Sequence, residues 1–284
     1  LCAGSIGTPQ LLELSGVGDG DRLKTLGIEP VLHRPGVGGN LQDHLQIRAV
    51  YQVQGVETLN TLANSWWGKA KIGLEYAFKR SGPMSMAPSQ LGAFTRSSPE
   101  FEWPNIEYHV QPLSLDAFGE PLHDFPAFTA SVCNLNPTSR GSVHITSNDF
   151  RQAPAIAPNY LSTEQDRKVA ADSLRVTRRI VSQPALAPFK PEEYKPGPQC
   201  QTDEELPIAI EDEGRDQADE AEKWCFIGAD HAGDADPAAV AGTTELPNCR
   251  CQVRKSAPSE SPSRSASALA LAPNALFHML KSPA

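Results

Sequence analysis

The chain changes character at about Leu206, and this change limits how much of it can form a packed core. The thirteen residues from Glu211 to Lys223 contain seven acidic and two basic side chains, which accounts for more than half of the net charge of −9. From residue 209 onward the aromatic residues are Trp224, Phe226 and Phe277 only. Such a segment buries too little apolar surface to offset the entropy that it loses on ordering. We therefore expect residues 207–284 to form a disordered tail and residues 1–206 to carry the fold.

Composition excludes several classes of protein. A net charge of −9 argues against a nucleic-acid-binding protein, because affinity for phosphates requires clustered Lys and Arg. No apolar run approaches the ~18 residues that a membrane span needs, so we expect no integral membrane segment. Six Cys in 284 residues are too few for a disulfide framework.

The N-terminus carries no targeting information. The chain opens at Leu1 without an initiator Met or a signal-peptide pattern, and we expect a fragment that begins inside a structural element. A cytoplasmic location is the default expectation, with peripheral membrane association as the alternative. The oligomeric state is left open.

The first eighteen residues predict a strand end, a glycine turn and a helix. Leu1–Ala3 is small and apolar, and residues 4–7 contain two Gly that suit a turn. Thr8 is a good helix N-cap, and Pro9 then occupies the first helical position, where its missing N–H costs nothing. In such a unit the backbone N–H groups can approach a cofactor closely.

The middle of the chain predicts an antiparallel sheet covered by helices. Strands are expected at residues 46–54, 105–112, 127–135 and 141–146, and helices at residues 58–79 and from Ser162 onward. In the second strand Ile106, Tyr108 and Val110 share one face, whereas Glu107, His109 and Gln111 share the other. In the second helix the buried stripe is expected to hold Val169, Ser173, Val176 and Ile180. This pattern favours an α+β fold with one apolar sheet face.

Two linked motifs near the N-terminus carry the functional prediction. Residues 4–18 read GSIGTPQLLELSGVG, and residues 35–44 read PGVGGNLQDH. The first resembles the second signature of the glucose–methanol–choline (GMC) oxidoreductase family, and the second resembles that family's Gly-x-Asn-Leu-Gln-Asp-His stretch at the same distance downstream. Looser similarities occur at residues 82–90, 136–141, 158–161 and 202–206. The resemblance covers about residues 1–206 and is closest to the choline and alcohol dehydrogenase branch.

This resemblance implies a domain organisation and a cofactor. Within an α/β flavoprotein family, residues 1–44 are expected to form the closing part of the FAD-binding domain and residues 45–206 the substrate-binding domain, with residues 207–284 as a tail. The implied cofactor is FAD. Contact with the flavin is expected from Ala3, Gly4 and Ser5, and a place near it for Asn40 and His44. The alternatives are that Gly4 and Gly7 only turn the chain and that the loop at 40–44 is structural.

The resemblance also implies a substrate-binding surface. In the family, the antiparallel sheet covers the substrate cavity, so Glu107 and His109 are candidates for contact with a small-molecule alcohol. A solvated polar face is the alternative explanation for these two residues. Choline, an aliphatic alcohol and a polyol all remain open as substrates.

The implied reaction is an FAD-dependent oxidation of a CH–OH group to an aldehyde or ketone. A hydride passes to the flavin N5 while a His takes the hydroxyl proton, since its pKa lies near working pH. The sequence contains neither a Gly-x-Gly-x-x-Gly turn after a strand, which would hold the FAD pyrophosphate, nor the His-Pro-x-Gly-Thr motif of the catalytic base. His231 lies at a plausible distance, but its neighbours do not match that motif. We therefore name no catalytic residue.

Two explanations account for the missing motifs. The first is a damaged reading of a working dehydrogenase, in which a frameshift or a mis-joined gene model replaces the sequence after Leu206. The second is a truncated or decayed gene product without activity, acting at most as a binding or interaction module. Metal binding is suggested only by Cys225, His231, Cys249 and Cys251, whose spacing departs from that of structural zinc sites, so we expect no metal site.

Overall fold

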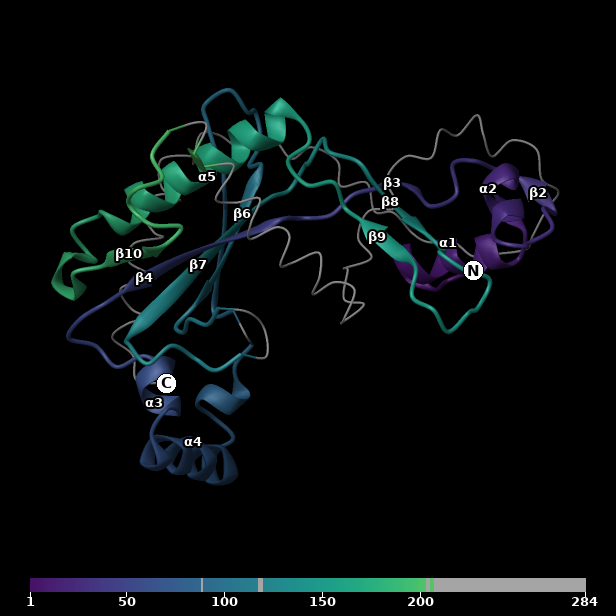
Figure 1. Cartoon of the computed structure of the whole chain (residues 1–284). Coiled ribbons are helices and arrows are strands. Elements are labelled where there is room, and N and C mark those ends of the chain that lie inside the picture. Colours follow the sequence, from purple (N-terminus) through teal and green to yellow (C-terminus); the bar gives the residue numbers. More distant parts are fainter. Residues whose placement is uncertain (88, 117–119, 203–204, 207–284) are drawn as a thin grey trace, which may run out of the picture.

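A five-stranded antiparallel sheet with one long helix on it forms the centre of the larger of two lobes (Figure 1). The computed structural model describes residues 1–87, 89–116, 120–202 and 205–206. The strand order is β10-β4-β7-β6-β5. The bounds are β4 Gln46–Gln52, β5 Leu91–Thr95, β6 Ile106–Gln111, β7 Ala127–Asn134 and β10 Glu192–Lys195, and the helix is α5, Glu164–Val181.

The alternation in β6 explains how the sheet and α5 pack. Ile106, Tyr108 and Val110 are buried on the apolar face, as the sequence predicts. The Tyr108 hydroxyl lies 2.9 Å from the Thr177 hydroxyl, which joins β6 to α5. On α5 itself Val169, Ser173 and Val176 are buried and Ile180 is partly buried, so the predicted stripe is confirmed.

The start of α5 differs from the prediction by one residue. Thr163 is the N-cap, and its hydroxyl accepts the Asp166 N–H at 3.2 Å. The Asp166 carboxylate bonds to a segment outside the helix. It accepts hydrogen bonds from the Thr138 and Ser139 N–H groups, both at 2.8 Å. This bonding ties the turn before β8 (Gly141–His144) to the helix.

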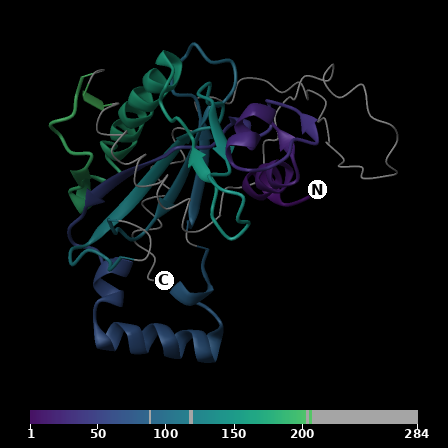
Figure 2. The ribbon, with the colours of Figure 1, turned by 45° about the vertical axis from the view of Figure 1, so that its right-hand side comes forward.

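The smaller lobe contains the first N-terminal motif, residues 4–18, and the start of the second, residues 35–44 (Figures 1 and 2). It holds α1 (Gly4–Leu14), α2 (Gly20–Thr25) and the short parallel pair β1 (Val17–Gly18) and β2 (Leu32–His33). A three-stranded sheet of order β3-β8-β9, with β3 at Gly39–Leu41 and β9 at Ala155–Ala157, lies beside α1.

The N-terminal helix begins earlier than predicted. It begins at Gly4, and Leu1–Ala3 belong to no strand in the described part of the chain. Thr8 is not the cap, since its hydroxyl accepts the Ala3 N–H at 3.2 Å and so stabilises the residue before the helix. Pro9 lies inside the helix, where it leaves the Ser5 carbonyl without its intrahelical donor. Pro9 therefore marks the interior of this helix and not its start.

The helix predicted over residues 58–79 is two helices. α3 covers Leu59–Ala63 and α4 covers Trp66–Lys79. The chain breaks between them because the Ser65 side chain caps α4 by accepting the Gly68 N–H at 3.0 Å. Two 3-10 turns complete the described elements, η1 at Pro83–Ser85 and η2 at Ala187–Phe189.

The described helices and sheets confirm the α+β fold class. Among the described residues no helix combines the length and the apolar character needed to cross a bilayer. The predicted tail at residues 207–284 lies outside the described residues, as do His231 and the three Cys at positions 225, 249 and 251.

Candidate functional site

The amino end of α1 presents open backbone donors. Ala3, Gly4 and Ser5 are all exposed. Gly4 has φ +73°, and an added Cβ there would meet no atom within 4 Å. The Gly4 and Ser5 N–H groups belong to the first turn, which has no intrahelical acceptor, and no acceptor for them occurs among the described residues. This surface therefore offers amide donors and room for a ligand to approach.

A small apolar cluster brings Asn40 to the same lobe. Ile6 of α1, Leu41 of β3 and Val143 of β8 are packed together and buried. Asn40, adjacent to Leu41, is exposed and has φ +63°. Gly38 allows β3 to approach β8, because an added Cβ would lie 2.1 Å from the Val143 carbonyl oxygen.

The segment after β3 links the small lobe to the large sheet. The His44 Nε2 lies 3.1 Å from the carbonyl oxygen of Leu135, just beyond the end of β7. The neighbouring Asp43 accepts a hydrogen bond from the Tyr160 hydroxyl. Burial, together with the Asp43 charge, raises the pKa of Tyr160 far above its ordinary value, so the phenol stays protonated and donates.

Glu107 and His109 lie side by side on the polar face of β6. The His109 Nε2 is 3.4 Å from the Glu107 Oε1, and both side chains are partly exposed. Cys133 of β7 is directly opposite Glu107 in the antiparallel register. The three side chains place one ligand-type atom each within 4.8 Å of one another.

Cys133 contributes a protonated thiol to this cluster. It is 1% exposed, and burial, reinforced by the Glu107 charge, raises its pKa to about 12. The Asp43 charge acts in the same direction. Gln46 of β4 and Glu107 of β6 both lie opposite Cys133 of β7, so the Asp43–His44 segment leads into the Glu107 end of the sheet. The predicted residues thus fall into two groups: Ala3, Gly4, Ser5 and Asn40 in the small lobe, and His44, Glu107 and His109 at the end of the sheet.

A pocket beside Asp43 is too small for a cofactor. It is lined by Asp43, Tyr160 and Asp166, among others, and has a volume of about 30 Å³. That is room for about one water molecule. This pocket therefore holds neither a flavin nor an alcohol.

Comparison with known proteins identifies the family. A GMC oxidoreductase model of the N-terminal region matches residues 1–46, and one of the C-terminal region matches residues 137–235. An oxygen-dependent choline dehydrogenase from Citrobacter koseri is 43% identical over 212 residues, which is 75% of this chain and 38% of that protein. The chain belongs to the GMC oxidoreductase family. It spans about two fifths of the length of the curated relatives that it matches.

Solved structures of the family share the fold. Pyridoxine 4-oxidase from Mesorbium loti has a TM-score of 0.58 at 26% identity, covering 74% of this chain and 38% of that one. A formate oxidase from Aspergillus oryzae, whose FAD modification has been studied in variants, has a TM-score of 0.63 at 21% identity, covering 74% and 41%. GMC oxidoreductases are FAD-dependent flavoproteins.

The residues present fit part of a flavin site. The open helix amides beside Gly4, with free space where a side chain would otherwise stand, suit close approach of a cofactor. Gly18 of β1 and Gly20 of α2 flank a turn from a strand to a helix, but Asp21 stands where the Gly-x-Gly-x-x-Gly turn that holds a pyrophosphate has its third glycine. The fit therefore concerns contact with the flavin and not its phosphate anchor.

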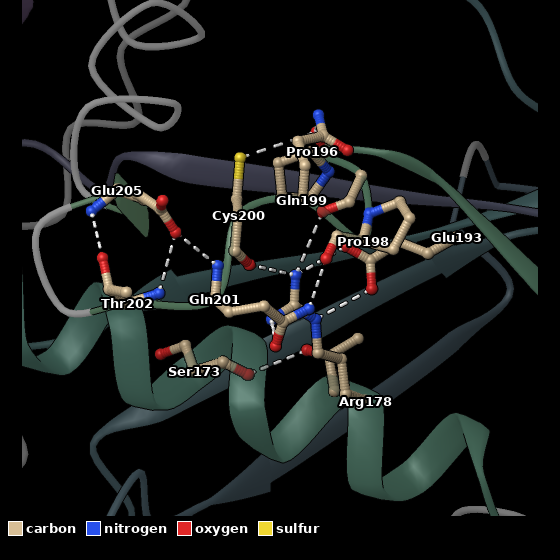
Figure 3. Close-up of polar contacts among 12 residues, drawn as sticks. Ser173, Arg178, Glu193, Pro196, Pro198, Gln199, Cys200, Gln201, Thr202 and Glu205 are labelled. Carbon is tan, nitrogen blue, oxygen red and sulfur yellow. Dashed lines mark hydrogen bonds and ion pairs between the residues drawn. The ribbon is translucent and has the colours of Figure 1, made fainter.

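Two buried charges, Glu13 and Asp166, and the partly buried Arg178 were not predicted from the sequence of this GMC chain. Glu13 is 1% exposed and bonds Arg22 and His144, and Asp166 is 4% exposed. Arg178 bonds both Glu193 carboxylate oxygens at 2.8 Å and the Cys200 carbonyl at 2.8 Å (Figure 3). Glu13 reaches His144, 131 residues away, and Arg178 reaches Glu193, 15 residues away, and no local pattern indicates these partners.

Arg178 fixes the segment that precedes the tail. In Figure 3 its guanidinium points from α5 towards Glu193 and the loop that contains Cys200. Immediately afterwards the Thr202 hydroxyl accepts the Glu205 N–H at 3.1 Å, and the Glu205 carboxylate accepts the Thr202 N–H at 3.1 Å. This capping box marks a helix start at the place where the sequence resembles the last family helix before the active-site motif.

Proposed function

We propose that this chain forms part of an FAD-dependent oxidoreductase that oxidises the CH–OH group of a small alcohol, with choline as one candidate. Family membership supports the reaction class, and the names of the most similar curated relatives support choline. The structural observation that supports the proposal is the register of the large sheet, in which Gln46, two residues after His44, and Glu107 lie on either side of Cys133. This register connects the segment of Asn40 and His44, proposed to lie near the flavin, with Glu107 and His109, proposed to bind the alcohol.

In this proposal Ala3, Gly4 and Ser5 contact the flavin, with Asn40 and His44 near it. When bound, the flavin accepts the hydride from the alcohol carbon. The chain's own contribution is to offer backbone donors at the start of α1, where the helix dipole favours an electron-rich or anionic group. Gly4 keeps that approach open because no side chain covers it.

Glu107 and His109 would bind the alcohol. With its Nε2 proton held towards Glu107, His109 keeps Nδ1 as an acceptor for the substrate hydroxyl. The Glu107 carboxylate supplies a negative charge that would attract a quaternary ammonium group such as that of choline. The neighbouring Cys133 stays a neutral thiol and adds no competing charge.

FAD binding tests the flavin side of the proposal. The purified chain is titrated with FAD, and binding is followed through the flavin absorption and fluorescence. Gly4→Val is expected to weaken binding by about tenfold, because the side chain fills the approach to the helix amides. Gly27→Val is the matched control, since Gly27 has nearly the same φ, +75°, in the turn after α2. Equal effects of the two substitutions, or no association with FAD in the starting chain, would refute the flavin contact.

We also propose that the chain lacks turnover on its own, since its sequence contains neither the phosphate-binding turn nor the base motif. Choline oxidation with an artificial electron acceptor tests this. Activity in the purified chain would contradict it.

Resequencing of the gene and its flanks separates the two explanations for the missing motifs. A His-Pro-x-Gly-Thr motif in another frame after Leu206 and a strand–turn–helix upstream would support a damaged reading of a working enzyme. An intact frame without these motifs would support a non-catalytic product, acting at most as a binding module.

A further inference from the structure

Helix α4 turns its apolar side outward. Trp66 and Trp67 are each 87% exposed, Phe78 is 84% exposed and Leu74 is 58% exposed. Trp67, Leu74 and Phe78 are seven and four residues apart, so they lie along one side of the helix, with Trp66 beside them. The opposite side contains the buried Gly68 and the half-buried Ile72 and Tyr76. Trp66, Trp67, Leu74 and Phe78 therefore face solvent, whereas Ile72 and Tyr76 face the protein.

The position of α4 leaves this face open. Its main contacts are with α3 and η1. Figures 1 and 2 show the helix at the extremity of the larger lobe, beyond the ends of the strands. The sheet therefore covers none of the four apolar side chains.

Basic residues accompany the apolar face. From Trp66 to the C-cap Arg80, the basic side chains are Lys69, Lys71, Lys79 and Arg80. The one acid in this stretch is Glu75, which is half-buried and accepts a hydrogen bond from the Ser81 hydroxyl at 3.1 Å. The helix is thus locally cationic in a chain whose net charge is −9.

Some of these cations lie next to aromatic rings. The Lys69 ammonium is 5.9 Å from the centre of the Trp66 ring. Arg80 is 5.2 Å from the Tyr76 ring. Long basic side chains around exposed Trp and Phe match the two requirements of a membrane–water interface, where indole rings enter the headgroup region and cations meet anionic headgroups.

We propose that α4 is an interfacial helix that docks this protein on an anionic lipid bilayer. The helix lies in the plane of the membrane, with Trp66, Trp67, Leu74 and Phe78 inserted. The basic residues contact the headgroups. Charge selects this occupant, because the exposed side chains from Trp66 to Arg80 include aromatic residues and cations but no acid.

Vesicle co-sedimentation of the full 284-residue chain tests the proposal. One set of vesicles contains phosphatidylcholine alone, and the other contains about 30% phosphatidylglycerol, a fraction chosen to give a negative surface potential. We expect binding to the anionic vesicles that weakens as salt is raised. Trp66→Ser combined with Trp67→Ser should lower the partition coefficient by about tenfold or more. Lys69→Gln combined with Lys71→Gln should remove most of the preference for anionic lipid.

Trp103→Ser is the matched control. Trp103 is 69% exposed in the loop between β5 and β6, at the other end of the sheet from α4, so its loss should leave partitioning unchanged. Circular dichroism checks that each variant keeps its fold. Protection of Trp fluorescence from acrylamide on vesicle addition, lost in the double Trp variant, gives a second readout that does not depend on sedimentation.

Three results would overturn the proposal. The first is a failure to bind anionic vesicles. The second is binding that survives the double Trp substitution. The third is concentration-dependent self-association that is abolished by that substitution while vesicles have no effect, because the face would then bind a second copy of this chain.

Discussion

Glu13 and His144 are 131 residues apart in the sequence, and the His144 Nδ1 lies 2.7 Å from the Glu13 Oε1. The same carboxylate accepts from Arg22 at 3.0 Å and from the Ile145 N–H at 2.8 Å. Glu13 is on α1 and His144 on β8, so this one buried side chain joins the N-terminal family motif to the C-terminal half of the chain.

Removal of Glu13 should therefore destabilise the smaller lobe. In Glu13→Ala the Ile145 N–H loses its acceptor, and the partly buried Arg22 guanidinium keeps only the Ile145 carbonyl. We expect the free energy of unfolding to fall by about 3 kcal/mol, measured by urea denaturation at neutral pH. Glu100→Ala is the control, because Glu100 is exposed and meets Lys168 at 3.5 Å on the surface. An equal effect of both substitutions would show that the Glu13 contacts add nothing.

Asp166 should make stability depend on acid pH. Burial raises its pKa, but the hydrogen bonds from Ser139 and Thr138 outweigh burial and hold the pKa below the ordinary 3.8. Since the folded pKa is the lower one, this stabilisation is complete above the unfolded pKa and is lost as pH falls through the folded pKa.

Asp166→Asn should thus be less stable than the parent by about 2 kcal/mol at pH 7. The difference should narrow when urea unfolding is repeated below pH 3.8. Asp149→Asn is the control, since the Asp149 pKa is also lowered, by Arg151, but the group is exposed. A constant difference between Asp166→Asn and the parent from pH 7 to pH 3 would contradict the assigned cause.

Cys133 should be unreactive in the folded chain. Burial raises its pKa to about 12, and the thiolate is the reactive form, whereas Cys2 is exposed. At pH 8 a thiol reagent should modify Cys2 at least about tenfold faster than Cys133, as followed by peptide mass spectrometry. The two rates should become similar in urea. Fast labelling of Cys133 without denaturant would show that the Glu107 cluster is open to solvent.

Gly38 should tolerate no side chain. It has φ +80°, and an added Cβ would lie 2.1 Å from the Val143 carbonyl oxygen. Gly38→Ala is expected to cost about 2 kcal/mol or more and to separate β3 from β8. Gly36→Ala, where an added Cβ meets no atom within 4 Å, should be close to neutral. Matching thermal midpoints for the two variants would refute the close approach.

Local patterns in the sequence predicted much of the large lobe. The alternation of Ile106, Tyr108 and Val110 correctly predicted β6 and its buried face. The apolar stripe that begins at Val169 correctly predicted the buried side of α5. Two boundaries were wrong for local reasons. Pro9 predicts a helix start, but the helix already begins at Gly4, and the cap at Ser65 splits the helix predicted over residues 58–79.

The sequence by itself determined the family, through the motifs at residues 4–18 and 35–44, and the α+β class, through periodicities that depend only on neighbouring residues. Tertiary structure alone decided which charged residues are buried or partly buried. Glu13, Asp166 and Arg178 look like ordinary surface charges until partners from distant segments reach them. It also decided that Trp67 and Phe78 face outward, because an amphipathic pattern defines two sides of a helix but not which of them the rest of the fold will cover.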